Sequence, residues 1–182
     1  MRYLKSKLIT RLFVLLAVAS FAAQSARANE SDRGPELPLP LCESIRVEAG
    51  HVLAFHTYAV GVQVYRWNGA SWAFVEPVAN LYADKGFRGQ VGTHYAGPTW
   101  ESNSGSRVVS RRVANTGCTP DANAIPWLLL ETVSADGPGI FDGVTFIQRV
   151  NTVGGRAPTA PGSPGEMRNV AYTAEYFFYR AP

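Results

Sequence analysis

Short apolar runs separated by turn residues are the feature that most constrains how this chain folds. From Ser44 onward the runs are rich in valine, phenylalanine, tyrosine, tryptophan and threonine. Turn residues interrupt them at intervals of about ten positions, and no window carries the apolar stripe of an amphipathic helix. This pattern is typical of an all-β domain. We therefore expect antiparallel strands in a β-sandwich of two sheets, with a partly closed β-barrel as the alternative.

The clearest hairpin spans Val60 to Glu76. Asn68-Gly69 is the residue pair favoured in a two-residue turn, and alternating residues flank it. In the first strand of this hairpin the valines share one face, whereas Gln63 and Tyr65 share the other. The complete set of expected strands is Ser44–Glu48, His51–Ala59, Gly61–Trp67, Ser71–Glu76, Ala79–Ala83, Val91–Tyr95, Arg107–Ala114, Trp127–Ser134, Val144–Asn151 and Val170–Arg180.

The N-terminus has the three parts of a secretory signal peptide. Basic residues precede a mostly apolar run from Leu12 to Ala23, and the small-x-small site Ala26-Arg27-Ala28 follows. The run is too short for a membrane anchor, which needs about 20 residues. We therefore expect residues 1–28 to be a cleaved signal peptide, residues 29–43 an extended Pro-rich leader, and residues 44–182 a single β domain. The mature protein is then periplasmic or extracellular, with no membrane span.

Cleavage reverses the sign of the net charge. The whole chain carries 17 basic and 14 acidic residues, which gives a net charge of +3. The expected signal peptide contains five of the basic residues and none of the acidic ones, so the mature chain has a net charge of −2. A basic surface for nucleic acid is therefore not indicated. In an oxidising compartment the two cysteines, Cys42 and Cys118, are expected to form a disulfide, the alternative being two free buried thiols.

Known catalytic and cofactor motifs are missing from the sequence. The three histidines do not form a cluster with other metal ligands, and a metal site needs three or four convergent groups. The Gly-x-Ser-x-Gly elbow of hydrolases and the phosphate-binding loop of nucleotide-binding proteins are also missing. We therefore expect neither a bound metal nor a cofactor.

Aromatic and polar residues around the Gly97-Pro98 step form the candidate site. Proline removes a hydrogen-bond donor from the sheet, so we expect the strand to bend here and to open a polar pocket. Arg149, an embedded cation, is expected to pair with Glu101, either beside a ligand or as a plain buried ion pair. The candidate ligand-binding residues are His94, Tyr95, Trp100, Glu101, Trp127, Gln148 and Arg149.

Five blocks of sequence, in this order, resemble the secreted domain-of-unknown-function family numbered 3455. They are Gly61–Tyr65, His94–Glu101, Ala124–Leu130, Val144–Thr152 followed by Gly154–Gly155, and Tyr172–Tyr179. The resemblance implies little about activity, because the family has no settled one. Some members are labelled malate dehydrogenase, but this chain lacks the Gly-rich turn and the alternating strands and helices of a nicotinamide-binding domain. We do not expect a NAD-dependent malate dehydrogenase.

Three functions remain open at this point. The first is a non-enzymatic secreted or periplasmic module that binds a small molecule or glycan. The second is a hydrolase or lyase that uses His94 and Glu101 as base and acid. The third is a structural protein of the envelope or surface without a ligand.

Overall fold

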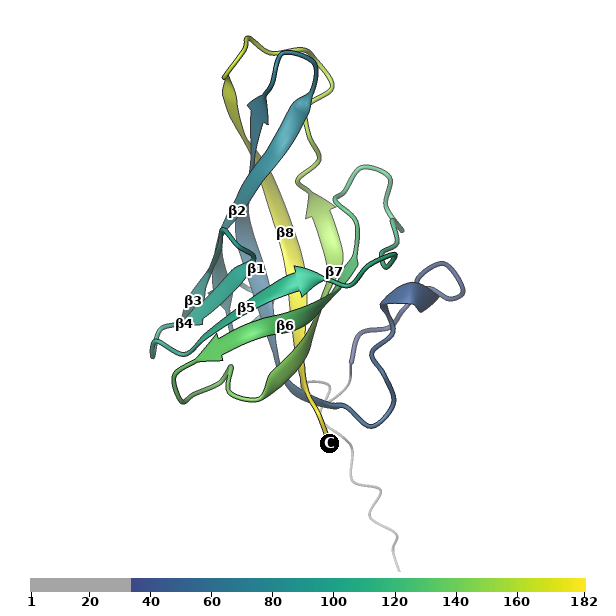
Figure 1. Cartoon of the computed structure of the whole chain (residues 1–182), viewed down its shortest axis with the longest axis vertical. Helices are drawn as coiled ribbons and strands as arrows, with labels where there is room; N and C mark the ends of the chain where they lie inside the picture. The colour runs from purple at the N-terminus through teal and green to yellow at the C-terminus, as the bar shows by residue number, and fades with distance from the viewer. Residues whose placement is uncertain (1–33) are drawn as a thin grey trace, which may run out of the picture.

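The computed structural model describes residues 34–182, so the expected signal peptide and the start of the leader lie outside the described residues. Within the described range eight strands and one short 3₁₀ helix form the regular structure. The strands follow one another around a closed barrel in chain order (Figure 1). They are β1 (Val52–Trp67), β2 (Trp72–Tyr82), β3 (Gln90–Tyr95), β4 (Thr99–Ser102), β5 (Arg107–Arg112), β6 (Leu128–Asp136), β7 (Val144–Gly154) and β8 (Met167–Arg180), and the helix is η2 (Glu43–Ile45).

Pairing of the first strand with the last closes the barrel. β1 pairs with β8 from Val52–Arg180 to Arg66–Met167, and every other strand is antiparallel to its neighbours along the chain. The all-β, antiparallel prediction is thus confirmed, in the form of the barrel rather than the sandwich expected first. Both architectures bury one face of alternating strands, so the pattern of residues did not separate them. Closure pairs the central parts of the long strands on both sides, whereas β2 before Ala79 and β8 before Tyr172 pair with β1 alone.

Two expected breaks in the strands are absent, because β1 continues through Gly61 and β2 through Pro77. A Cβ at Gly61 would overlap the carbonyl oxygen of Val78, so glycine is required there by the close approach of β2. The expected strand Ser44–Glu48 is wrong, since this segment begins as η2 and belongs to no sheet. Strand β4 was not expected.

The hairpin between β1 and β2 is confirmed, with its turn shifted by one residue. Trp67 pairs with Trp72, and the backbone N–H of Asn68 donates to the carbonyl of Ser71. The side-chain oxygen of Asn68 accepts hydrogen bonds from the backbone of Ala70 and Ser71, so Asn68 begins the turn. Gly69 has a φ of 97°, and this favours glycine.

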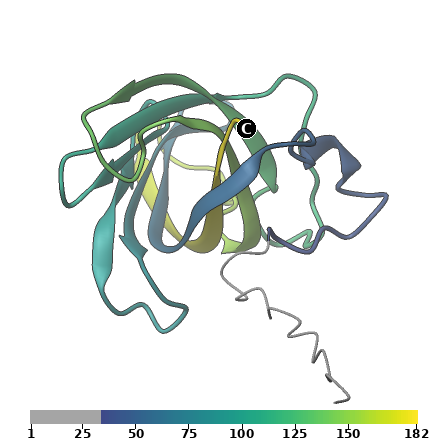
Figure 2. The same ribbon diagram turned by 90° about the horizontal axis from the view of Figure 1, so that it is seen from below.

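The two ends of the barrel differ. The upper end, as drawn in Figure 1, carries the β1–β2 hairpin, the β3–β4 turn and the loops that follow β5 and β7. The lower end, which Figure 2 shows from below, carries the other connections and the C-terminus. Here Phe141 packs against Phe55 and Phe178, with ring centroids 5.2 Å away in both cases. Phe141 is only 1% exposed, so this end of the interior is filled.

The segment before β1 covers the outer face of β6, β7 and β8. Cys42 and Ile45 pack there with Trp127, Val150 and other residues in a second hydrophobic cluster outside the barrel. The predicted disulfide between Cys42 and Cys118 is confirmed, with Cα atoms 5.2 Å apart. It fixes the leader to the loop that follows β5. Across residues 34–182 no helix is long and apolar enough to cross a membrane.

Candidate functional site

A cavity of about 210 Å³ lies inside the upper half of the barrel, below the Gly97-Pro98 turn. Its walls combine aliphatic side chains, aromatic and imidazole rings from β2, β3, β4 and β8, and two arginines. It is lined by Gln63, Phe74, Val75, Pro77, His94, Gly97, Pro98, Trp100, Arg112, Leu128, Leu130, Arg149 and Tyr176. Aspartate and glutamate are absent from this lining. Eight-stranded barrels are just wide enough to hold either side chains or one small ligand.

The β3–β4 hairpin brings His94 and Trp100 into this cavity. Gly97, with a φ of 88°, allows the chain to reverse at once, so Tyr95 pairs with Thr99 and His94 pairs with Trp100. Cross-strand partners share a face, and both side chains point into the barrel. The two rings are stacked with centroids 4.2 Å apart, and the ring of Tyr176 meets the imidazole edge-on at 5.1 Å.

The imidazole of His94 is neutral and has a defined tautomer. Its Nδ1 lies 2.8 Å from the carbonyl oxygen of Thr99, which can only accept, so Nδ1 carries the proton. Burial lowers the pKa of His94 to about 3, and the positive charge of Arg149 acts in the same direction. The remaining nitrogen, Nε2, is therefore a hydrogen-bond acceptor at neutral pH.

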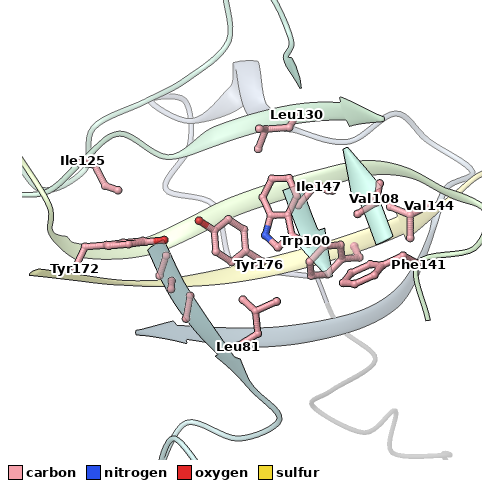
Figure 3. Packing of buried hydrophobic residues seen from close by; sticks show 14 residues of the cluster. Leu81, Trp100, Val108, Ile125, Leu130, Phe141, Val144, Ile147, Tyr172 and Tyr176 are labelled. Atoms are coloured by element: carbon pink, nitrogen blue, oxygen red, sulfur yellow. The ribbon is translucent and has the colours of Figure 1, made fainter. Parts of the chain in front are cut away.

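Several buried polar atoms on the cavity wall make no hydrogen bond of good geometry within the described part of the chain. They are the indole nitrogen of Trp100, the amide nitrogen of Gln63 and the hydroxyl of Tyr176. In Figure 3 the indole nitrogen of Trp100 is on the side of its ring that faces Tyr176. Gln63 is close enough to Tyr172 to lower the pKa of that phenol, yet burial raises it overall. Buried polar groups usually have partners, so this set calls for an explanation.

Two arginines line the cavity, and Arg112 is the last residue of β5 whereas Arg149 lies in the middle of β7. The guanidinium of Arg112 donates to the carbonyl of Thr116, and that of Arg149 donates to the carbonyl of Pro126 at 2.8 and 3.2 Å. Burial raises the pKa of Tyr176, and the charge of Arg149 opposes this rise. Arg149 also acts on the phenol of Tyr65, so its field extends through the upper half of the barrel.

Comparison with protein families matches residues 48–180 to the family described as protein of unknown function (DUF3455). The chain belongs to this family. The match contains all eight strands of the barrel and begins after the leader and η2. The resemblance seen in the five sequence blocks is thereby confirmed. Comparisons with curated proteins and with solved structures gave no match.

The structure of this DUF3455 chain does not bring His94 and Glu101 together. Glu101 pairs with Thr93 on the outer face of the hairpin, where its carboxylate accepts a hydrogen bond of 2.5 Å from the hydroxyl of Tyr95. This hydrogen bond raises the pKa of Tyr95. The expectation that the Gly97-Pro98 step lets Trp100 and Glu101 reach one cavity is wrong, because the chain makes a complete hairpin and keeps its alternation.

The expected ion pair between Glu101 and Arg149 is also not formed within residues 34–182. Arg149 points into the barrel and binds a carbonyl instead. In the same described range no group of three or more His, Cys, Asp or Glu side chains is arranged to hold a metal ion.

Trp127 and Gln148 lie outside the barrel, beneath the leader. Trp127 belongs to the cluster around the disulfide. The amide nitrogen of Gln148 donates to the carbonyl of Ile45 at 2.7 Å, and its oxygen accepts from the hydroxyl of Tyr179 at 2.6 Å. Gln148 and Arg149 are neighbours on one strand and so point to opposite faces. The candidate residues of the cavity are thus His94, Trp100 and Arg149.

Sequence reasoning missed several other residues of the cavity, among them Gln63, Arg112, Leu128 and Tyr176. Gln63 gave a usable signal, since it is a polar residue inside an apolar strand. The sequence contains no comparable signal for Arg112, because Arg112 follows Arg111 at the end of a strand. Only the closed barrel shows which of the two arginines lines the cavity. Arg111 instead pairs with Glu131 on the outer surface.

Proposed function

We propose that this protein is an exported binding protein that holds a small organic molecule in the upper cavity of its barrel. The observation that carries the proposal is the cavity of about 210 Å³ itself, whose lining combines apolar side chains with Arg112 and Arg149 and contains no carboxylate. A cavity with two cationic side chains and no carboxylate in its lining is suited to a ligand that brings hydrogen-bond acceptors.

The size of the cavity sets the size of the ligand. Pockets for drug-sized molecules occupy about 300–1,000 Å³, and the cavity below Gly97 occupies about 210 Å³. A single sugar ring or a small metabolite is of suitable size, and a longer glycan would extend past the mouth. The acid and base of a hydrolase are not supported here, because His94 faces inward and Glu101 outward.

The proposal of export rests on the N-terminal sequence and is compatible with the disulfide that the chain forms. We propose that residues 1–28 are removed, that residues 29–43 remain as the leader, and that residues 44–182 are one domain. Intact mass of the protein recovered from the periplasm or medium should correspond to a chain that starts at Asn29. A mature protein that starts at Met1 would overturn this layout.

A ligand screen followed by thermal melting tests the binding function. A molecule that binds only the folded state at 100 times its Kd adds about 2.7 kcal/mol to the free energy of unfolding. The screen should contain small metabolites and simple sugars. A matched pair of variants then locates the site: Leu128→Phe places a larger side chain on the cavity wall, whereas Val133→Phe adds the same ring at an exposed position of the same strand.

We expect the ligand to stabilise the parent and Val133→Phe, and to lose its effect on Leu128→Phe. If the ligand stabilises Leu128→Phe as much as the parent, it binds elsewhere. If no compound in the screen stabilises the parent, the binding function is overturned and a structural role becomes the better account.

A further inference from the structure

The hydrogen-bonding inventory of the cavity is unbalanced. An indole N–H and an amide NH₂ can only donate, and those of Trp100 and Gln63 make no hydrogen bond of good geometry in the described structure, although Gln63 lies near the hydroxyl of Tyr172. The hydroxyl of Tyr176 can donate as well. Against these, Nε2 of His94 is the one ring nitrogen there that only accepts, since Nδ1 is bound to Thr99. Hydrogen-bond donors therefore outnumber acceptors among the polar side chains around the cavity.

The charge of the cavity is unbalanced in the same direction. Arg112 and Arg149 line it, and within residues 34–182 no carboxylate lies within the 4.0 Å of an ion pair from either guanidinium. Both use main-chain carbonyls as acceptors, and neither is neutralised by a carboxylate, although Arg112 is exposed and Arg149 is half-buried. On the outer faces of β5 and β6 an arginine does have an acidic partner, since Arg111 forms an ion pair with Glu131 at 2.8 Å. An arginine fork matches the two oxygens of a carboxylate.

The remaining walls are apolar and mostly flat. Phe74, Pro77, Pro98, Leu128 and Leu130 belong to the cavity lining, together with the stacked rings of His94 and Trp100. Flat rings and prolines suit an aromatic body better than a branched polar one. A fully hydrated ion such as phosphate would leave these walls without contacts.

We propose, on the basis of the proposed binding function, that the ligand is a small aromatic carboxylate, bound as its anion. Its carboxylate faces Arg112 and Arg149, and its ring lies against Leu128 and Leu130, the residues that pair with these arginines across the strands. The acceptor nitrogen of His94 adds a preference for a ligand with one hydroxyl group.

Matched acid and amide pairs test the role of charge without any change in the protein. We would measure calorimetric titrations of the mature, disulfide-bonded protein with benzoate and benzamide, phenylacetate and phenylacetamide, and cinnamate and cinnamamide. Each pair has nearly the same shape, so only the charge and the acceptor differ. We expect at least one acid to bind about tenfold or more tightly than its amide, which is the effect of losing a charge-assisted hydrogen bond.

Three variants assign the effect to the cavity arginines. Arg149→Met and Arg112→Met should each weaken binding of the preferred acid about tenfold or more and should narrow the difference from its amide. Arg111→Met is the matched control, because it lies next to Arg112 on the same strand and pairs with Glu131 outside the barrel. Its affinity for the acid should equal that of the parent. Circular dichroism establishes that each variant is folded.

The outcomes separate this inference from the proposed function. If the amides bind as tightly as their acids, the cavity binds ligands, but the proposal that it selects a carboxylate is overturned. If inorganic phosphate binds as tightly as the best acid, the proposal that the ligand has an aromatic ring is overturned. If none of the six compounds binds, the aromatic carboxylate is overturned, and the metabolite and sugar screen decides separately whether the cavity binds any ligand.

Discussion

The two ends of the barrel are built from the same strands but differ in how their interiors are filled. At the lower end the rings of Phe55, Phe141 and Phe178 pack against each other, and Phe141 is almost completely buried. At the upper end the same strands β1 and β8 present Gln63 and Tyr176, whose buried polar atoms lack good partners. Figure 3 shows this change along the interior, from Phe141 at one end to Tyr176 and Tyr172 at the other. The lower end therefore provides stability, and the upper end gives up some stability for a polar cavity.

Truncation of the aromatic plug should have the largest effect. Phe141→Ala removes a ring that contacts two other phenylalanines and should lower the free energy of unfolding by about 3–5 kcal/mol. Leu128→Ala, on the cavity wall, should cost clearly less, because that side chain is only half buried and already borders open space. Urea unfolding of both variants measures the difference. Equal losses would show that the two ends are packed alike.

The neutral histidine of the upper end should make stability depend on pH. The pKa of His94 is about 3 in the folded protein, whereas the ordinary value of 6.5 applies in the unfolded chain. Between these two pH values only the unfolded chain binds the proton. The free energy of unfolding should therefore fall as the pH falls through this window, by at most about 1.4 kcal/mol per pH unit for this group. Arg149 and Tyr176 face the imidazole, and the charge of Arg149 disfavours its protonation further.

His94→Gln removes the titrating group from the same position. Urea unfolding of the parent and of this variant, measured at several pH values between 4 and 7, should give a smaller slope for the variant. The carboxylates titrate in both proteins, so their contribution to the slope cancels when the two slopes are subtracted. Parallel slopes would mean that the imidazole is protonated in the folded cavity.

Two buried glutamines offer a direct comparison of satisfied and unsatisfied polar groups. Gln63 and Gln148 are each 2% exposed, but only Gln148 has partners for both ends of its amide. Gln148→Met should cost about 1–3 kcal/mol, because it leaves the carbonyl of Ile45 and the hydroxyl of Tyr179 without partners. Gln63→Met should cost nothing or raise stability by about 1 kcal/mol. Thermal melts that show the same loss for both would indicate that Gln63 is satisfied.

Much of the fold was predictable from the sequence because alternation and turn residues report on local structure. The strands around Val64, Val108 and Phe177 were found this way, and so was the hairpin at Asn68. The register across Gly97-Pro98 was not, since a bend and a hairpin use the same residues there and only pairing with β5 distinguishes them. Barrel closure depends on contacts between β1 and β8, which lie more than one hundred residues apart.

The candidate site was predicted in part for the same reason. Alternation puts Gln148 and Arg149 on opposite faces but does not say which face is inside. In β1 the usual rule is inverted, because Gln63 points into the barrel. Polar residues therefore marked the correct strands, whereas the choice between Gln148 and Arg149 required the closed barrel and the leader that covers its outer wall.

The smallest effect is expected at the tip of the β1–β2 hairpin, which stands beyond the cavity. Gly69 has a φ of 97°, and a Cβ added there would meet no atom within 4 Å, so only backbone strain opposes a larger residue. Gly69→Val should therefore cost about 1 kcal/mol, and Gly69→Asn less, because asparagine tolerates positive φ better than a β-branched residue. Thermal melts measure both, and the affinity for a cavity ligand should not change in either variant. Loss of ligand affinity in Gly69→Val with normal stability would show that the hairpin tip is part of the binding site, and the functional end of the barrel would then extend beyond its mouth.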